Sequence, residues 1–246
     1  MKYINFYIFI FLLISLLTAE KKESKYKGNW PTNNIDKKVI KSNILPLCPH
    51  DIGCTCTNNS DCTNNNCIKI PRGSYCFPTT GDYFPDFKGI DQFDEIVDIY
   101  DFSNQNKYIL IEMAAEWCSP CHVLSNWITF KDEEIYTHKW WKEEYNIIHD
   151  LIHNNEIFFI TVMYENEFKE NATYQTVSEW YQNYPDDKIP ILADSNKYLH
   201  TWLKPAGIPA IILLDQNMKI VEYTNRGLNA AFDKLVKIYN DIESSK

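Results

Sequence analysis

The sequence has no cluster of lysine and arginine residues in its body, and its 33 acidic side chains outnumber its 24 basic ones. A formal net charge of −9 repels a phosphate backbone, so the composition argues against nucleic acid as a partner. The acidic balance otherwise indicates a soluble surface and nothing more specific.

Metal-ligand spacings are also scarce. The chain has one Cys-x-x-Cys pair, Cys118 and Cys121, and no second pair. Because tetrahedral zinc normally takes two such pairs, or one pair with added histidines, we expect no metal there. No cysteine follows the N-terminal apolar run, which argues against a bacterial lipoprotein anchor.

The chain does have enough apolar material for one full domain. Of its 246 residues, 45% are hydrophobic and 15% are aromatic. That is sufficient for a full-sized core and one small additional unit.

The N-terminus has the layout of a secretory signal. Lys2 precedes an almost unbroken apolar run from Ile4 to Leu17, and the small residue Ala19 stands before a charged segment. We therefore predict a signal peptide over residues 1–19 and a protein that is periplasmic or secreted. The alternative is an uncleaved anchor that acts as a membrane tether, because Leu17 is large for its place before the cleavage point.

Two further segments precede the main domain. Residues 20–45 are rich in Lys, Asn and Ser without an apolar period, which predicts a solvated linker. Residues 46–77 hold six of the eight cysteines in a segment too short and too polar for a core. This predicts a disulfide framework in an oxidising compartment, with its pairing undetermined and a zinc site as the alternative. The six are Cys48, Cys54, Cys56, Cys62, Cys67 and Cys76.

The most informative stretch is an apolar strand that leads into the cysteine pair. Residues 109–115 are almost all apolar, Trp117 follows, and a helix opens at Cys118. The Cys118 sulfur is thereby placed at a helix N-terminus, where unpaired amide N–H groups and the helix dipole favour a thiolate. Cys121 lies one helical turn further in, so a mixed disulfide with a substrate can be resolved within the same site.

At these residues the chain resembles the thioredoxin superfamily. Residues 81–87, Gly-Asp-Tyr-Phe-Pro-Asp-Phe, are similar to the opening of the TlpA/ResA-like branch of extracytoplasmic thiol-disulfide oxidoreductases. Ile208 and Pro209 stand directly before an apolar strand, where thioredoxin folds carry a cis-proline. The resemblance implies an α/β fold over residues 78–246, with a mixed central sheet flanked by helices and preceded by the small disulfide-rich module.

The resemblance also implies roles for the residues of the pair. Cys118 is the expected nucleophile and Cys121 the buried resolving thiol. Glu112 occupies the place of a buried acid beneath the resolving cysteine, where an apolar setting raises the pKa of a carboxyl and suits it to accept a proton. The alternative for Glu112 is an edge carboxylate that faces water.

Trp117, Ile208 and Pro209 are the expected substrate-binding residues. Trp117 is expected to cover the sulfurs, and a cis bond before Pro209 leaves the backbone of Ile208 free to pair with an extended substrate. Plain core packing is the alternative for Trp117, and an ordinary trans bond for Pro209. The expected activity is disulfide exchange with protein substrates and an unidentified redox partner, without a cofactor.

Three alternatives stay open. The run Cys118-Ser119-Pro120-Cys121-His122 matches the Cys-x-x-Cys-His pattern of covalent haem attachment. The cysteine pair can also be a permanent structural disulfide. The third alternative is a non-catalytic binding protein, in which the Cys-rich module engages a partner on a redox-inert scaffold. In the preferred interpretation, His122 is a solvated residue of the first helical turn.

Hydrophobic periodicity predicts the remaining elements. These are a hairpin through 96–102, a helical region over 119–153 with a break near 131–132, a buried strand over 156–163, a helix over 173–184, a turn at 215–217 between two strands, and a closing helix over 228–242.

Overall fold

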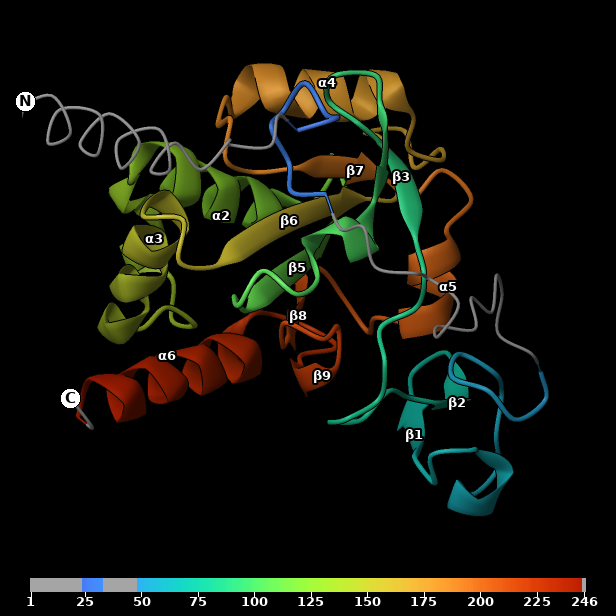
Figure 1. Cartoon of the computed structure of the whole chain (residues 1–246). Coiled ribbons are helices and arrows are strands. Elements are labelled where there is room, and N and C mark those ends of the chain that lie inside the picture. The colour runs from blue at the N-terminus through green and yellow to red at the C-terminus, as the bar shows by residue number, and fades with distance from the viewer. Residues whose placement is uncertain (1–23, 33–47, 245–246) are drawn as a thin grey trace, which may run out of the picture.

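The computed structural model describes residues 24–32 and 48–244, and its centre is a mixed sheet in the order β4-β3-β7-β6-β5-β8-β9 (Figure 1). β5, β6 and β7 run parallel to one another, whereas every other neighbouring pair in this sheet is antiparallel. The strands are β3 Lys88–Asp91, β4 Ile96–Asp98, β5 Ile109–Ala114, β6 Phe158–Met163, β7 Ile191–Ala193, β8 Ala210–Leu214 and β9 Ile220–Tyr223.

The central strands are buried on both faces. Every residue of β5, β7 and β8 is buried, and so is every residue of β6 after Phe158. Strands covered on both sides form continuous apolar runs rather than alternating ones, which is why the sequence shows them clearly. The predicted mixed central sheet is confirmed.

The helices follow the predicted positions closely. α2 Ser119–Phe130 ends where Lys131 adopts a φ of 56°, at the predicted break. Short 3-10 turns at Glu133–Thr137 and Glu143–Tyr145 then lead into α3 Asn146–His153. α4 Tyr174–Asn183 and α6 Asn229–Glu243 match the other two predicted helices.

The helices α2 and α4 pack against the same face of the sheet. Ser125 and Ile128 of α2 line a small cavity together with Trp180 of α4. Phe159 and Thr161 of β6 form the floor of this cavity. The side chain of Thr161 therefore points toward α2.

Two elements carry no clear sequence signal. β7 has three residues, and α5 Tyr198–Leu203 has six. The residue before α5, Lys197, makes no side-chain cap. Both elements are too short to show a period, and the position of β7 depends on its neighbours β3 and β6.

Residues 24–32, which we call the N-terminal strap, show that the prediction of a solvated linker over 20–45 is wrong for this part. Tyr26 and Trp30 are buried in the core. The Tyr26 hydroxyl donates to Asp101 Oδ2 at 2.6 Å, and Trp30 Nε1 donates to Asp91 Oδ2 at 2.9 Å. These partners lie far along the chain, so no local pattern reveals them.

The rest of the predicted linker and the predicted signal peptide over 1–19 lie outside the described residues. Within 24–32 and 48–244, no helix is both long enough and apolar enough to cross a membrane.

The six N-terminal cysteines form three disulfides: Cys48–Cys54, Cys56–Cys67 and Cys62–Cys76. This confirms the predicted disulfide framework and supplies the pairing that the sequence leaves open. β1 Cys67–Ile70 and β2 Gly73–Cys76 form its antiparallel hairpin.

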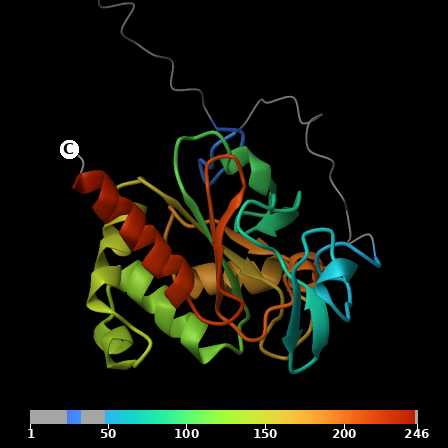
Figure 2. The ribbon, with the colours of Figure 1, turned by 90° about the horizontal axis from the view of Figure 1, so that it is seen from below.

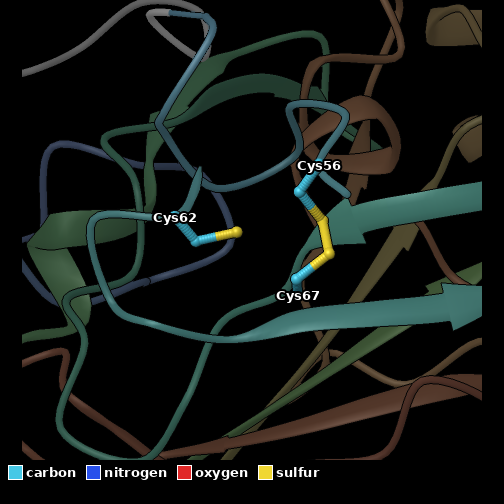
Figure 3. Close-up of side chains that lie close together, drawn as sticks. All are labelled: Cys56, Cys62 and Cys67. Atoms are coloured by element: carbon cyan, nitrogen blue, oxygen red, sulfur yellow. A yellow bond between two sulfur atoms is a disulfide. The ribbon is translucent and has the colours of Figure 1, made fainter. Parts of the chain in front are cut away.

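The sulfurs of Cys56, Cys62 and Cys67 lie within 4.8 Å of one another. Figure 3 shows Cys62 pointing toward the Cys56–Cys67 bond. Because each of the three sulfurs is bonded to another sulfur in a disulfide, none of them provides a thiolate ligand for a metal. The zinc alternative is therefore not supported.

The disulfide module packs on the main domain beside α5 and β9 (Figures 1 and 2). Gly53 has a φ of 87°, and a Cβ at this position would lie 2.9 Å from the carbonyl oxygen of Thr201 in α5. The Phe77 ring stacks on Tyr223 of β9 with 6.3 Å between centroids. The module is thus held against the sheet rather than joined to it by a free tether.

Candidate active site

The cysteine pair lies where the central strand β5 passes into α2. Cys118 is the N-cap residue of α2, and its Sγ accepts a hydrogen bond from the Cys121 amide at 3.2 Å. The two cysteines form a disulfide. Cys118 is 2% exposed and Cys121 is fully buried, so Cys118 is the sulfur nearer to solvent.

Trp117 stands beside the pair with 41% of its surface exposed. It is therefore a surface side chain, and the alternative of plain core packing is wrong. Its Nε1 donates to Glu165 Oε2 at 2.8 Å, and Lys197 Nζ bonds the other oxygen of Glu165 at 2.7 Å. The Trp117 ring also meets Tyr164 edge-on, with 6.5 Å between centroids. These contacts fix an aromatic surface next to Cys118.

The loop before β8 supplies the other side of the site. The Ile208–Pro209 peptide bond is cis, as predicted. β8 pairs with β5, and the first residue of β8, Ala210, is opposite Met113 near the end of β5 that leads to the cysteines. Among the described residues, no partner bonds to the backbone N–H or C=O of Ile208. This backbone is thus available to an extended chain laid along it.

Glu112 is fully buried in β5, which rules out the alternative of an edge carboxylate facing water. Its Oε2 accepts a hydrogen bond from the Thr161 hydroxyl at 3.2 Å, while Oε1 has no partner within the described residues. Because Thr161 points toward α2, Glu112 lies on the face of the sheet that carries the cysteine helix. Burial raises the pKa of Glu112 to about 8.

His122 is held in place rather than solvated, so the sequence-based expectation for it is wrong. Its Nε2 donates to the carbonyl oxygen of Glu116 at 2.5 Å, and its Nδ1 meets the Tyr184 hydroxyl at 2.5 Å. The ring also packs on Trp180, with 4.5 Å between centroids. Both ring nitrogens are occupied and both sulfurs are joined, so the haem alternative is not supported. Two of these partners, Trp180 of α4 and Tyr184 directly after α4, lie about 60 residues along the chain, so the local sequence does not reveal them.

An acidic cleft of about 380 Å³ opens beside His122. Glu116, Glu167 and Glu179 line it, together with Trp180 and polar residues of α4. The Glu167 amide donates to Glu116 Oε2 at 2.9 Å, which fastens the loop after β6 to the residue before Trp117. Burial, and then the neighbouring carboxylates, raise the pKa of Glu116.

The site and the fold together define a class. A Cys-x-x-Cys disulfide at the start of a helix, a buried acid in the preceding central strand and a cis-proline before the antiparallel neighbour of that strand form the thioredoxin-like arrangement. The resemblance to the thioredoxin superfamily is confirmed at the level of the fold.

No family model matches the chain, and no curated protein matches it. Among solved structures, it is similar to a putative thiol:disulfide interchange protein DsbE from Chlorobium tepidum, with 17% identity and a TM-score of 0.47 over 68% of this chain and 97% of that one. A putative protein disulfide isomerase from Bacteroides thetaiotaomicron has 19% identity and a TM-score of 0.45, covering 67% of this chain and 89% of the other.

The exposed lipoprotein thioredoxin of Streptococcus pneumoniae has 17% identity and a TM-score of 0.44, over 63% of this chain and 98% of that one. These similarities are distant and describe the path of the chain. The chemistry of the site rests on its own geometry.

Proposed function

We propose that the protein is an extracytoplasmic thiol-disulfide oxidoreductase that exchanges disulfides with protein substrates through Cys118 and Cys121. The observation that carries this proposal is the disulfide at the start of α2, with its outer sulfur beside the exposed Trp117 and the backbone of Ile208, which has no hydrogen-bond partner among the described residues. The apolar N-terminal run and the three disulfides of the module support a location outside the cytosol.

In the reducing direction, the Cys118 thiolate attacks one sulfur of a client disulfide. The client bond breaks, its first sulfur leaves as a thiolate, and a mixed disulfide forms. Cys121 then loses its proton and attacks Cys118 Sγ, which releases the second client sulfur. The client gains two electrons, and the Cys118–Cys121 bond forms. The oxidising direction is the same sequence reversed.

Glu112 is the proposed acceptor of the Cys121 proton. An ordinary thiol has a pKa of about 8.5, so a carboxyl with a pKa of about 8 exchanges a proton with it at little free-energy cost. Glu112 is buried on the side of the sheet that α2 covers, and its Oε1 is without a partner among the described residues.

The asymmetry of the two thiols provides the test. Cys121→Ser leaves the attacking sulfur active but removes the resolving one, so we expect long-lived mixed disulfides with client proteins in cells of the native host. Cys118→Ser keeps only the fully buried sulfur and is expected to trap almost nothing. The measurement is non-reducing electrophoresis followed by mass spectrometry.

Equal trapping by both variants would overturn the assignment of roles. Trapping by neither would favour the non-catalytic binding protein, with the module engaging a partner without exchange. The trapped proteins themselves would identify the physiological clients.

A further inference from the structure

Arginine is rare in this chain: Arg72 and Arg226 are the only two among 24 basic residues. Arg226 lies in the loop after β9, which runs beside the cis-proline loop. The Gly227 amide donates to the Pro209 carbonyl at 2.6 Å. The Arg226 side chain covers Gly207, where a Cβ would lie 3.0 Å from its Cγ and Nε. Arg226 therefore lies against the residue that precedes Ile208.

The second arginine comes from the disulfide module. Arg72 is exposed in the turn between β1 and β2. Tyr75 of the same hairpin packs under Lys204, whose Nζ is 5.2 Å from the ring centroid. Lys204 opens the segment that leads through Gly207 to the cis-proline. The hairpin thus brings its turn to the start of the cis-proline loop.

The turn also lies beside the aromatic side of the site. His200 stacks on Tyr164 with 4.3 Å between centroids, and Tyr164 meets the ring of Trp117. Burial, followed by the nearby charge of Arg72, lowers the pKa of His200 to about 4. The same two causes lower the pKa of Lys204. Arg72 is therefore electrostatically close to His200, which stacks on Tyr164, and to Lys204, which precedes the cis-proline loop.

The three cations Arg72, Lys204 and Arg226, which we call the basic rim, have no carboxylate partner within residues 24–32 and 48–244. The neighbouring Glu165 is already bonded to Lys197 and Trp117. In a chain with a net charge of −9, a group of cations that has no carboxylate partner among the described residues attracts an anion to this part of the surface.

We propose that the basic rim binds an acidic side chain of the client protein next to the cysteine that Cys118 attacks. The disulfide module is then part of the substrate site, because it contributes Arg72. Guanidinium groups bind carboxylates through two parallel hydrogen bonds, which suits them to select an Asp or Glu at a defined place. This inference rests on the proposed function, since it requires that Cys118 attacks a client.

The test uses the full chain carrying Cys121→Ser, so that only the first exchange step is measured and the module keeps its disulfides. The probes are three peptides with one cysteine activated as a 2-thiopyridyl disulfide and flanked by Glu, Gln or Lys. The Cys118 thiolate attacks the peptide sulfur, the peptide–thiopyridyl bond breaks, and thiopyridone is released with the electron pair. Its absorbance reports the rate.

We expect the Glu peptide to react about three- to tenfold faster than the Gln peptide at low salt, with the Lys peptide slowest. Arg72→Gln and Arg226→Gln should each reduce this ratio, and the double variant should bring it close to one while the Gln peptide keeps its rate. Lys237→Gln removes one exposed cation on α6 and is expected to leave the ratio unchanged.

Two results would overturn the inference while leaving the proposed function intact. One is equal rates for the three peptides. The other is a double variant that keeps the preference for Glu or slows the Gln peptide as much as the Glu peptide. Absence of thiopyridone release from every peptide would instead overturn the proposed function, and this inference with it.

Discussion

At the scale of a single residue, Glu112 couples the active site to the stability of the fold. Burial raises its pKa from 4.5 to about 8, so the folded state holds a proton that the unfolded chain releases between these values. Stability is therefore greatest below pH 4.5 as far as this group is concerned. It falls as the pH rises to about 8, by up to about 1.4 kcal/mol per pH unit.

Glu112→Gln removes this titration. We expect the free energy of unfolding of the variant to change less with pH across that window than that of the wild type, as measured by urea denaturation of the oxidised proteins. The exposed Glu144→Gln is the control and should follow the wild type. Parallel curves for Glu112→Gln and the wild type would contradict the raised pKa.

The same substitution tests the proton path. An amide keeps the shape of the side chain but cannot accept the proton of Cys121, so resolution of the mixed disulfide should slow by on the order of a hundredfold. Attack by Cys118 should keep its rate. Rapid-quench analysis of the mixed disulfide separates the two steps, and unchanged resolution at neutral pH would remove Glu112 from the mechanism.

At the scale of an element, the N-terminal strap is held by single aromatic anchors. Trp30→Phe removes the indole N–H that donates to the fully buried Asp91, and leaves that carboxylate oxygen short of a donor. We expect a loss of about 1–3 kcal/mol in the free energy of unfolding, because a buried acceptor loses its donor. Ile96→Ala, at a position 62% exposed in the neighbouring β4, should cost no more than about 0.5 kcal/mol. Equal losses would show that the strap does not stabilise the sheet.

The strap is also an element that the sequence pattern does not predict. The strands and helices with an apolar period, such as β5, α2 and α6, are predictable because their own residues carry the pattern. Tyr26 and Trp30 stand in a polar segment, and their partners are 75 and 61 residues away. The contacts of His122 with Trp180 and Tyr184 are equally non-local. Motifs therefore predict the cysteine pair and the cis-proline, whereas the basic rim and the disulfide pairing depend on tertiary contacts.

At the scale of the whole molecule, alanine substitutions at two glycines distinguish the docking of the disulfide module on α5 from backbone strain alone. Gly53 and Gly81 both have positive φ angles, 87° and 95°, so an alanine costs roughly 1–2 kcal/mol of backbone energy at either position. At Gly53 the new Cβ would collide with α5, whereas at Gly81 none of the residues in 24–32 and 48–244 lies within 4 Å of it.

We therefore expect Gly53→Ala to lose more stability in urea than Gly81→Ala, and to lose the preference for the Glu peptide because the module shifts. Gly81→Ala should keep that preference. The same preference in both variants would show that docking at Gly53 does not position Arg72.

The short distances between sulfurs in the module make its disulfides prone to rearrangement when a reductant is present. Cys62 lies within 4.8 Å of both partners of the Cys56–Cys67 bond, so a thiolate released from either bond finds another disulfide in reach. Partial reduction then opens a route to isomers that have lost the native pairing without losing any cysteine. A monothiol or dithiol reductant added to drive the active pair can thus scramble the neighbouring bonds during the assay. Preparations are comparable only when their peptide maps show the same three pairings before and after turnover.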